Sequence, residues 1–452
     1  MFKNVVKHLR QLLAMTKTTE VLSASAGDAV LHKVADGRVE KAGTSADDQT
    51  PKEKRRGKWI KHAMLLAYQG KNYFGMQVQK GDTPAIENIL LRCMHELDYI
   101  TSEEAGQPFK FYFQRAARTD RSVSAVRQVC SMMLPSSDFK EKGVEKLNAL
   151  LPADIRVMGI RRTTKKFNAQ KDCDSRSYSY TLPTFAFSKI NEFSQADYRI
   201  TSETIAEVDS LLSLFVGTHN FYNYTSKKDH NDASCKRFII SFKCDKPFIY
   251  RNESGKDYEF VTVNIRGQSF MLHQIRKMIG MTIAISRGFV YKSDIQRSFD
   301  AQRMDVPKAP GLGLLLEQVH YERYDKRWCE SHETLNSWGE EIEGKIKKLK
   351  ENLIVKEILD TEIGTYSMFN WLSSLPHHNF TLNPESNEKA PTSPIAMASH
   401  SANVGIEKQT ENESGQTGIQ SESAENKIKQ ETESEAANVD ESQEAEKVAA
   451  KA

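Results

Sequence analysis

One carboxylate lies between two guanidinium groups in the run Arg118-Thr119-Asp120-Arg121. Such a carboxylate can be a catalytic group, or it can hold an ordinary structural network of ion pairs. The run itself does not separate these two interpretations. Alternating apolar residues predict strands at 109–113 and 126–132, so the loop from Ala117 to Ala125 connects two strands.

Arg276 is the candidate partner of Asp120. It lies in the segment 270–285, which the apolar pattern predicts to be a long helix with apolar residues on most sides. A guanidinium group there needs a carboxylate partner, because an uncompensated buried charge costs on the order of 3–5 kcal/mol. Pairing with Asp120 would keep that carboxylate ionised, which is the state that a carboxylate nucleophile requires.

A third group of candidates lies on one predicted strand. The segment 175–182 alternates polar and apolar residues, which places Arg176, Tyr178 and Tyr180 on one face. An aromatic side chain on this face would offer a stacking neighbour for chemistry at Asp120.

Pairs of basic residues recur through the chain, and aromatic residues stand near some of them. The pairs are Arg161-Arg162, Lys165-Lys166, Lys227-Lys228 and Lys236-Arg237. Basic side chains neutralise phosphates and aromatic faces stack on bases, so this pattern suits RNA. A solvated basic surface over a normal core is the alternative, and spacing alone leaves it open.

The sequence lacks the motifs of several common enzyme classes and of metal sites. The sequence has no dinucleotide-binding glycine motif, phosphate-binding loop, zinc-protease motif or nucleophile elbow. Its isolated histidines, His273 among them, lack metal-ligand spacing and are interpreted as core or surface residues. The 6 cysteines form no C-x-x-C pair, which argues for reduced thiols and against a zinc site or disulfide framework.

The predicted elements alternate in a way that favours an α+β fold with antiparallel pairing. Strands are predicted at 63–68, 156–160, 175–182, 237–244 and 259–265, and helices after Thr83-Pro84, at 144–150, at 205–216 with a cap at Gly217, at 270–285 and within 332–359.

Charge and composition change towards both ends of the 452 residues. Residues 401–452 hold 12 acids and 5 lysines, a charge of −7, so the +3 of the whole chain leaves +10 for the rest. The basic, amphipathic segment 1–17 is typical of a mitochondrial transit peptide, or of a disordered or short helical N-terminus. The basic cluster 51–58 is typical of a nuclear import signal or of an arm that contacts nucleic acid, although many such clusters have neither role.

The ordered motifs together resemble the TruA-type pseudouridine synthases, in particular their eukaryotic branch. The likeness runs from Trp59 to about Tyr324, with more at Trp371-Leu372. Its five motifs are Tyr68–Gln77, Ala117–Ala125, Phe167–Ala169 with Arg176-x-Tyr178-x-Tyr180, Phe270–Gly280 and Pro310–Leu314. Ser122 stands where glycine is usual and Gln170 where a basic residue is frequent, and neither change removes a chemical group.

The resemblance implies a cofactor-free and metal-free isomerisation of uridine to pseudouridine. Asp120 would be the nucleophile, acting on the base or on C1′, and Arg276 would hold it ionised. Tyr178 would stack on the uracil and assist loss of the C5 proton. Arg118 would help fill the space left by the flipped nucleotide. Arg176 and the basic pairs would hold the RNA backbone.

The implied fold is two α+β halves that share a continuous antiparallel sheet, with a basic cleft between them. We expect a basic N-terminal segment at 1–57, catalytic subdomains at 58–166 and 167–330, a helical extension at 331–380 and a disordered acidic tail at 381–452.

The expected partner is tRNA, with small nuclear or messenger RNA as further candidates and no membrane. We favour a monomer, in the nucleus or the mitochondrion or both. The competing hypotheses are a catalytically silent RNA-binding protein, such as a tRNA chaperone, on the same fold, and a carboxylate-dependent nucleotide hydrolase. The hydrolase would need a phosphate loop and a second paired acid, which the sequence lacks.

Overall fold

The computed structural model of the protein describes residues 58–79, 83–135, 138–190 and 197–380. The predicted N-terminal segment 1–57 and the predicted tail 381–452 lie outside the described residues, so both stay predictions.

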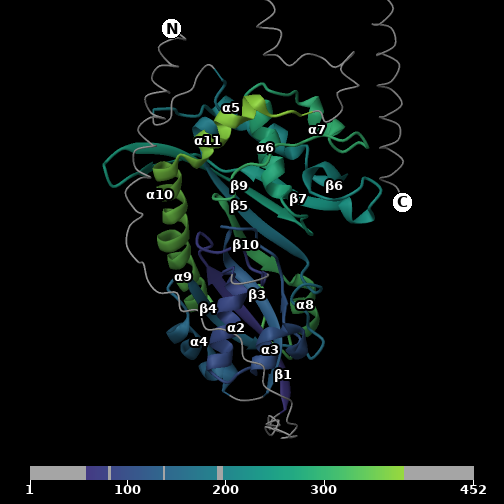
Figure 1. The fold of residues 1–452 in the computed structure, drawn as a ribbon, viewed down its shortest axis with the longest axis vertical. Helices are drawn as coiled ribbons and strands as arrows, with labels where there is room; N and C mark the ends of the chain where they lie inside the picture. Colours follow the sequence, from purple (N-terminus) through teal and green to yellow (C-terminus); the bar gives the residue numbers. More distant parts are fainter. Residues whose placement is uncertain (1–57, 80–82, 136–137, 191–196, 381–452) are drawn as a thin grey trace, which may run out of the picture. The chain divides into compact units, whose positions relative to one another are not determined.

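Ten strands form a single sheet in this part of the chain (Figure 1). Eight of them follow the spatial order β4 (Ile155–Arg162), β1 (Trp59–Tyr68), β3 (Ser124–Pro135), β10 (Leu314–His320), β5 (Ser175–Pro183), β9 (Asp257–Gly267), β7 (Lys236–Cys244) and β6 (Gly217–Asn220). The short strands β2 (Gln114–Arg115) and β8 (Phe248–Arg251) pair with β3 and β9.

The helices pack along this sheet. They are α2 (Ile86–Glu96), α3 (Ser102–Gly106), α4 (Phe139–Leu150), α5 (Ser202–Ser213), α6 (Gln274–Ser286), α7 (Ser293–Arg297), α8 (Glu322–Trp328), α9 (Glu340–Leu349), α10 (Lys356–Thr365) and α11 (Ser367–Ser374). Among them, α4 and α9 contact β4, and α5 contacts β7. The predicted α+β class is confirmed.

The sheet is mixed, so the prediction of a continuous antiparallel sheet is wrong at one junction. β10 runs parallel to β3, through Leu315 opposite Ser124 and Leu316 opposite Ala125. The pairs of β10 with β5 and of β1 with β3 are antiparallel. The parallel pair joins the two parts of the sheet immediately after the Asp120 loop, because β3 begins at Ser124.

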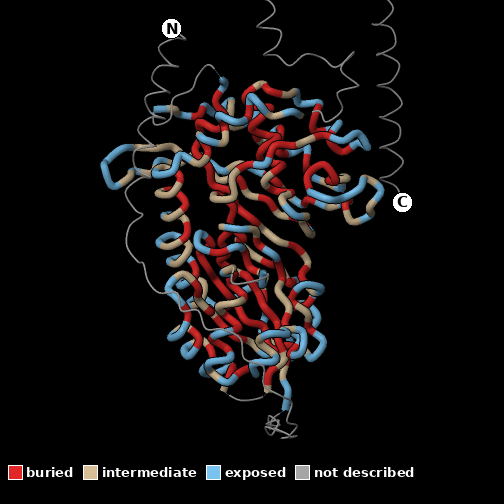
Figure 2. The backbone as a smooth tube through the Cα atoms, viewed as in Figure 1, coloured by how far each residue is buried: buried red, intermediate tan, exposed pale blue. Residues whose placement is uncertain are grey.

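The core follows the central strands (Figure 2). In β1 every residue from Lys61 to Tyr68 is buried. Unbroken burial of this kind means that both faces of the strand are covered, whereas a half-exposed strand would alternate. The loops at the ends of β1 and β3 are therefore held by a rigid sheet.

The strand predicted at 109–113 is wrong. Residues Pro108–Phe111 form the short 3₁₀ helix η1, and Tyr112 ends it with a φ of 55°. Phe111 and Phe113 are buried while Phe109 and Tyr112 are exposed. The spacing of the three phenylalanines matches the period of two of a strand, but a strand would place Phe109 on the same face as Phe111 and Phe113.

Several predicted helix ends also differ from the structure. The helix predicted over 270–285 begins only at Gln274, the one over 205–216 ends at Ser213, and Gly217 opens β6 with a φ of 107°. The helix predicted over 332–359 begins at Glu340 and passes through a π-helical stretch at Lys350–Val355 before α10. The N-cap of α2 is Ala85 instead of Thr83.

Candidate active site

The N-terminal part of the loop that carries Asp120 is anchored by buried and half-buried polar groups. The Gln128 side chain bonds both the backbone N–H and the carbonyl of Ala117, at 3.1 and 2.8 Å. The Thr119 hydroxyl lies 2.8 Å from the hydroxyl of buried Tyr68. Arg176 donates from Nε and Nη2 to the carbonyl of Ala116, at 3.3 and 2.9 Å. These bonds hold the loop in one conformation between β2 and β3.

The turn after β1 packs backbone against backbone on this loop. A Cβ on Gly75 would lie 2.4 Å from the Thr119 carbonyl oxygen, and one on Gly70 would lie 2.3 Å from that of Val123. Only glycine permits so close an approach. Ser122 has a φ of 63°, so the loop keeps a left-handed backbone at the position where the family usually has glycine.

The Asp120 side chain is 21% exposed and has two cationic or potentially cationic partners among the described residues. Its Oδ2 lies 3.0 Å from Nδ1 of His273 and 3.9 Å from Nη1 of Arg276. The ion pair with Arg276 was inferred from the sequence, but it is the longer of the two contacts. The alternative was a local network of ion pairs between Asp120, Arg118 and Arg121. In the described ranges Asp120 forms no ion pair with either of these two arginines.

Arg276 is held from both its backbone and its side chain. Its Nε donates to the carbonyl of Ala309 at 2.8 Å, and its own carbonyl accepts from the N–H of Ala309 at 3.1 Å. It lies in the first turn of α6, next to Gly311. The guanidinium group is therefore fixed before any substrate arrives.

His273 is a candidate functional residue that the sequence interpretation missed. It is the N-cap of α6, with a φ of 66°, and this backbone conformation turns its ring towards Asp120. Burial lowers the pKa of His273 below its ordinary 6.5, so the ring is neutral near pH 7. A neutral ring beside a carboxylate carries its proton on Nδ1 and donates it to Oδ2. The spacing of three residues between His273 and Arg276 is the signal that could have paired them.

Tyr178 lies in β5, and its ring packs edge-on against Phe270 at 5.3 Å between ring centroids. The side chain is buried, and this burial raises its pKa well above the ordinary 10, with the charge of Asp120 adding to the shift and that of Arg176 opposing it. The phenol is therefore protonated at neutral pH. On the same strand, Tyr180 donates its hydroxyl hydrogen to the carbonyl of Pro310 at 2.7 Å.

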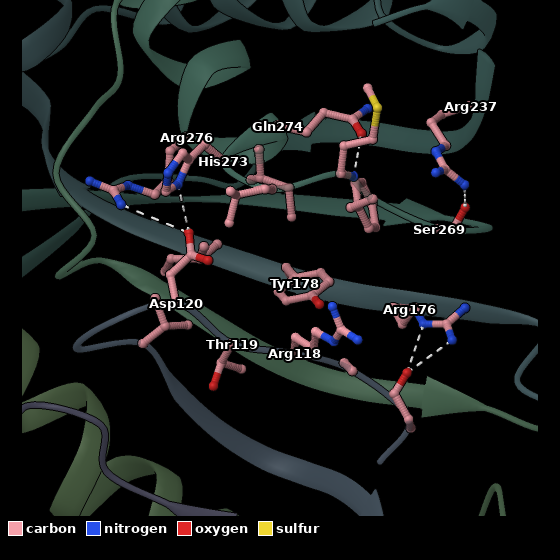
Figure 3. Close-up of a pocket in the computed structure, with 18 of the residues that line it drawn as sticks. Arg118, Thr119, Asp120, Arg176, Tyr178, Arg237, Ser269, His273, Gln274 and Arg276 are labelled. Carbon is pink, nitrogen blue, oxygen red and sulfur yellow. Dashed lines mark hydrogen bonds and ion pairs between the residues drawn. The ribbon is translucent and has the colours of Figure 1, made fainter. Parts of the chain in front are cut away.

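These residues surround one cavity of about 510 Å³ (Figure 3). All four residues predicted to be catalytic line it: Arg118, Asp120, Tyr178 and Arg276. Arg176 and Arg237 line it too, and Arg237 donates to the Ser269 hydroxyl at 2.8 Å. Figure 3 shows the Tyr178 ring and the Arg276 guanidinium on different sides of Asp120. A planar group that enters beside Tyr178 would meet a pre-positioned carboxylate.

The remaining basic residues predicted to bind RNA do not line this cavity. Arg162, Lys165, Lys166, Lys227 and Lys236 are exposed. Lys228 pairs with Asp232 at 2.5 Å. Arg161 makes contacts within the protein: its Nη1 donates to the Ser337 carbonyl at 2.6 Å, and its guanidinium group stacks 4.4 Å from the ring centroid of Trp338.

No metal-binding group of three or more His, Cys, Asp or Glu side chains occurs in the described ranges. None of the described helices is long and apolar enough to cross a membrane.

Comparison with known proteins places the chain in a family. A family model described as tRNA pseudouridine synthase matches residues 211–322. The chain is 40% identical over 340 residues to a Mus musculus protein named pseudouridylate synthase 1 homolog, across 74% of this chain and 77% of that protein. The Homo sapiens protein of that name is 42% identical over 323 residues, or 70% of this chain and 73% of the human protein. The chain belongs to the TruA-type pseudouridine synthase family.

A more distant relative of this synthase is the Saccharomyces cerevisiae protein named tRNA pseudouridine synthase 1. It is 30% identical over 356 residues, which cover 61% of this chain and 64% of the yeast protein. The family model covers α6, so Arg276 and His273 lie within the matched region, whereas Asp120 and Tyr178 lie before it. For the synthase, the fold is what brings these two groups of residues together.

Proposed function

We propose that this synthase isomerises uridines in tRNA to pseudouridine, with Asp120 as the nucleophile. The relatives whose names specify tRNA support the choice of substrate. The observation that carries the chemistry is the contact of Asp120 with His273 and Arg276 at the wall of a cavity that also contains buried Tyr178.

The reaction is internally balanced. The bond between C1′ and N1 breaks, a bond between C1′ and C5 forms, C5 loses its proton and N1 gains one. No electron is gained or lost overall, so the rearrangement requires no oxidant or reductant. Asp120 would form a transient covalent bond, either to the base or to C1′ after a glycal-forming step. Both versions place the same demand on the protein, which is a carboxylate held still beside the uridine.

We assign Tyr178 to stacking against the uracil. Its ring is fixed by Phe270 and forms one side of the cavity. Because burial raises the pKa of its hydroxyl, Tyr178 is better suited to pack against the base or to donate a hydrogen bond than to remove the C5 proton. The resemblance implied that Tyr178 both stacks on the uracil and assists loss of the C5 proton, and we propose only the stacking role.

The target uridine would be flipped out of its stem into the cavity, at a cost of a few kcal/mol for unstacking. Arg118 is exposed and lines the cavity, so its guanidinium group is suited to fill the space that the uridine leaves. Arg176 contributes by holding the Ala116 carbonyl and thereby the loop.

The exposed basic residues would bind the RNA backbone, as the pattern of basic pairs predicted. Lys165, Lys166, Arg162, Lys227 and Lys236 are the candidates whose charges face solvent. Phosphate contacts position an RNA without reading its sequence, so recognition would depend on the shape of the tRNA.

The decisive experiment measures tritium release from C5-tritiated uridine in tRNA transcripts. We expect release with the wild type, and a loss of at least about 1,000-fold with Asp120→Ala, because the covalent step is removed. Asp300→Ala is the matched control, since Asp300 is an exposed aspartate outside the cavity. It should release tritium at the wild-type rate.

Two outcomes would contradict the proposal in different ways. A wild type that binds tRNA but releases no tritium from any transcript would favour the silent RNA-binding alternative. A fully active Asp120→Ala variant would keep the enzyme and refute Asp120 as the nucleophile.

A further inference from the structure

A second cavity, of about 410 Å³, opens onto Asp120 from other elements. The residues that belong to it and not to the first cavity include Phe74 and Gln77 from the turn after β1, Arg121 from the catalytic loop, and Lys308 from the segment after α7. The two cavities share Arg118, Asp120, Leu272, His273 and Arg276 among their lining residues. Asp120 thus lies at the boundary between two adjoining spaces, and only the first of them contains Tyr178.

The charge of this second cavity suits a phosphate. Its lining includes four cationic side chains, Arg118, Arg121, Arg276 and Lys308, and one carboxylate, Asp120. Arg276 is committed to Asp120 and to the Ala309 carbonyl. The other three cationic residues are exposed. Three solvent-facing cations that converge beside a single, already paired carboxylate attract an anion.

The apolar groups of the cavity suit a nucleobase. Phe74 is 41% exposed, and the guanidinium carbon of Arg121 lies 4.4 Å from its ring centroid. Leu272, on another element, is 55% exposed. Single exposed apolar side chains are ordinary, but here two of them line one cationic cavity. Guanidinium planes and aromatic rings both stack on bases, so the Phe74–Arg121 pair offers a stacking platform.

We propose that this second cavity binds the nucleotide that directly neighbours the target uridine in the RNA strand. This inference rests on the proposed function. A flipped uridine in the first cavity remains bonded to its neighbours through one phosphate on each side, and the second cavity adjoins the first at Asp120. The base of the neighbour would stack on the Phe74–Arg121 pair, and its phosphate would lie near Lys308. Holding this nucleotide would keep the uridine in the flipped position.

The test is a double-mutant cycle between protein and RNA. The modified uridine is first mapped in tRNA transcripts treated with the wild type. Transcripts with an abasic residue on one side or the other of that uridine are then compared with the intact RNA. On one side, we expect the abasic change to lower wild-type kcat/KM about tenfold, because a stacked base is lost. In Phe74→Ala, kcat/KM on intact RNA should fall by a similar factor, and the abasic change should have little further effect.

Three further variants separate stacking from folding and from phosphate binding. Phe74→Tyr keeps the ring and should remain sensitive to the abasic change, as the wild type is. Phe109→Ala removes a phenylalanine that is 70% exposed and does not line this cavity, and it should retain sensitivity to the abasic change. Lys308→Ala should reduce the slope of log Kd against log salt by about 1, measured by anisotropy with the intact transcript, while Lys326→Ala should not.

The outcomes distinguish the inference from the function on which it rests. If the wild type forms pseudouridine and abasic residues on both sides are tolerated without loss, the inference is wrong and the function stands. Additive effects of Phe74→Ala and the abasic change would equally overturn it, because the two groups would then not interact. If the wild type forms no pseudouridine in any transcript, the proposed function fails, and the inference fails with it.

Discussion

Of the two side chains that pair with the Asp120 carboxylate in the described ranges, His273 makes the shorter contact. Arg276, at 3.9 Å, supplies charge, whereas His273, at 3.0 Å, supplies a directed hydrogen bond. A hydrogen bond fixes the direction of a carboxylate oxygen more strictly than a longer ion pair does. We therefore interpret His273 as a positioning residue for Asp120.

Replacing His273 should affect turnover more than RNA binding. Hydrogen bonds to charged groups contribute about 1.5–3 kcal/mol, so His273→Leu should lower kcat about 10- to 100-fold with little change in KM. His273→Asn should restore most of the rate, because asparagine tolerates a positive φ and its amide can donate to the same oxygen. The measurement is kcat and KM for tritium release, with thermal unfolding as a check on folding. Equal rates for His273→Leu and the wild type would refute this role.

At the scale of single elements, α6 and the segment that follows α7 form one unit. A Cβ on Gly280 would lie 2.1 Å from the Pro307 carbonyl oxygen, and Ala309, two residues further on, bonds Arg276 at both backbone and side chain. The glycine thus permits the close packing that fixes Arg276.

Gly280→Ala should therefore reduce both stability and activity. Forcing a methyl group into this contact should lower the free energy of unfolding by about 1–3 kcal/mol and lower kcat through displacement of Arg276. Gly344→Ala on α9 is the matched control, since nothing lies within 4 Å of the added Cβ. There, alanine should stabilise the helix by up to about 1 kcal/mol. Urea unfolding and tritium release measure the two effects. If Gly280→Ala has the stability and the kcat of the wild type, the contact between α6 and Pro307 does not fix Arg276.

Glu362, at the junction of α10 and α11, makes stability depend on pH. Its Oε1 accepts the N–H of Met368 at 2.7 Å, and burial raises its pKa from 4.5 to about 7. Between pH 4.5 and 7 the unfolded chain loses this proton before the folded one does, so this group lowers stability as pH rises.

Glu362→Gln should remove that dependence. The variant should be more stable than the wild type at pH 8, by up to about 3 kcal/mol, and the difference should disappear near pH 4.5. Exposed Glu351→Gln is the control and should behave as the wild type at both pH values. Urea unfolding at pH 4.5 and 8 provides the measurement. A difference between Glu362→Gln and wild type that is the same at both pH values would contradict the assignment.

At the scale of the whole molecule, the basic residues divide into two groups. Three arginines contact other residues of the protein: Arg161 stacks on Trp338, Arg176 donates to the Ala116 carbonyl and Arg237 donates to the Ser269 hydroxyl. Lys165 and Lys166 are exposed, and neither forms an ion pair with a residue in the described ranges. We expect phosphate binding mainly from the second group.

Lys165→Ala/Lys166→Ala should weaken tRNA binding at low salt and reduce the slope of log Kd against log salt by about 1–2, as expected for the loss of one or two phosphate contacts. Lys347→Ala/Lys348→Ala on α9 removes the same charge from another exposed site and is the matched control. Fluorescence anisotropy over a salt series measures both. An unchanged slope for the Lys165/Lys166 variant would place the phosphate contacts elsewhere.

The sequence by itself determined the α+β class, the strands at β1, β3, β4, β5, β7 and β9, and Asp120, Tyr178 and Arg276 as candidates. Local periodicity and ordered motifs carry that information. Periodicity could not distinguish the turn at 109–113 from a strand, because phenylalanines at every second position give the same sequence pattern in both.

Only the tertiary structure decided that β10 lies parallel to β3, that His273 reaches Asp120 across 153 positions of sequence, and that Asp120 borders two cavities. These facts depend on which distant segments pack together. The spacing of His273 and Arg276 indicates that the two residues can act together, but it does not show that His273, at a positive φ, meets Asp120.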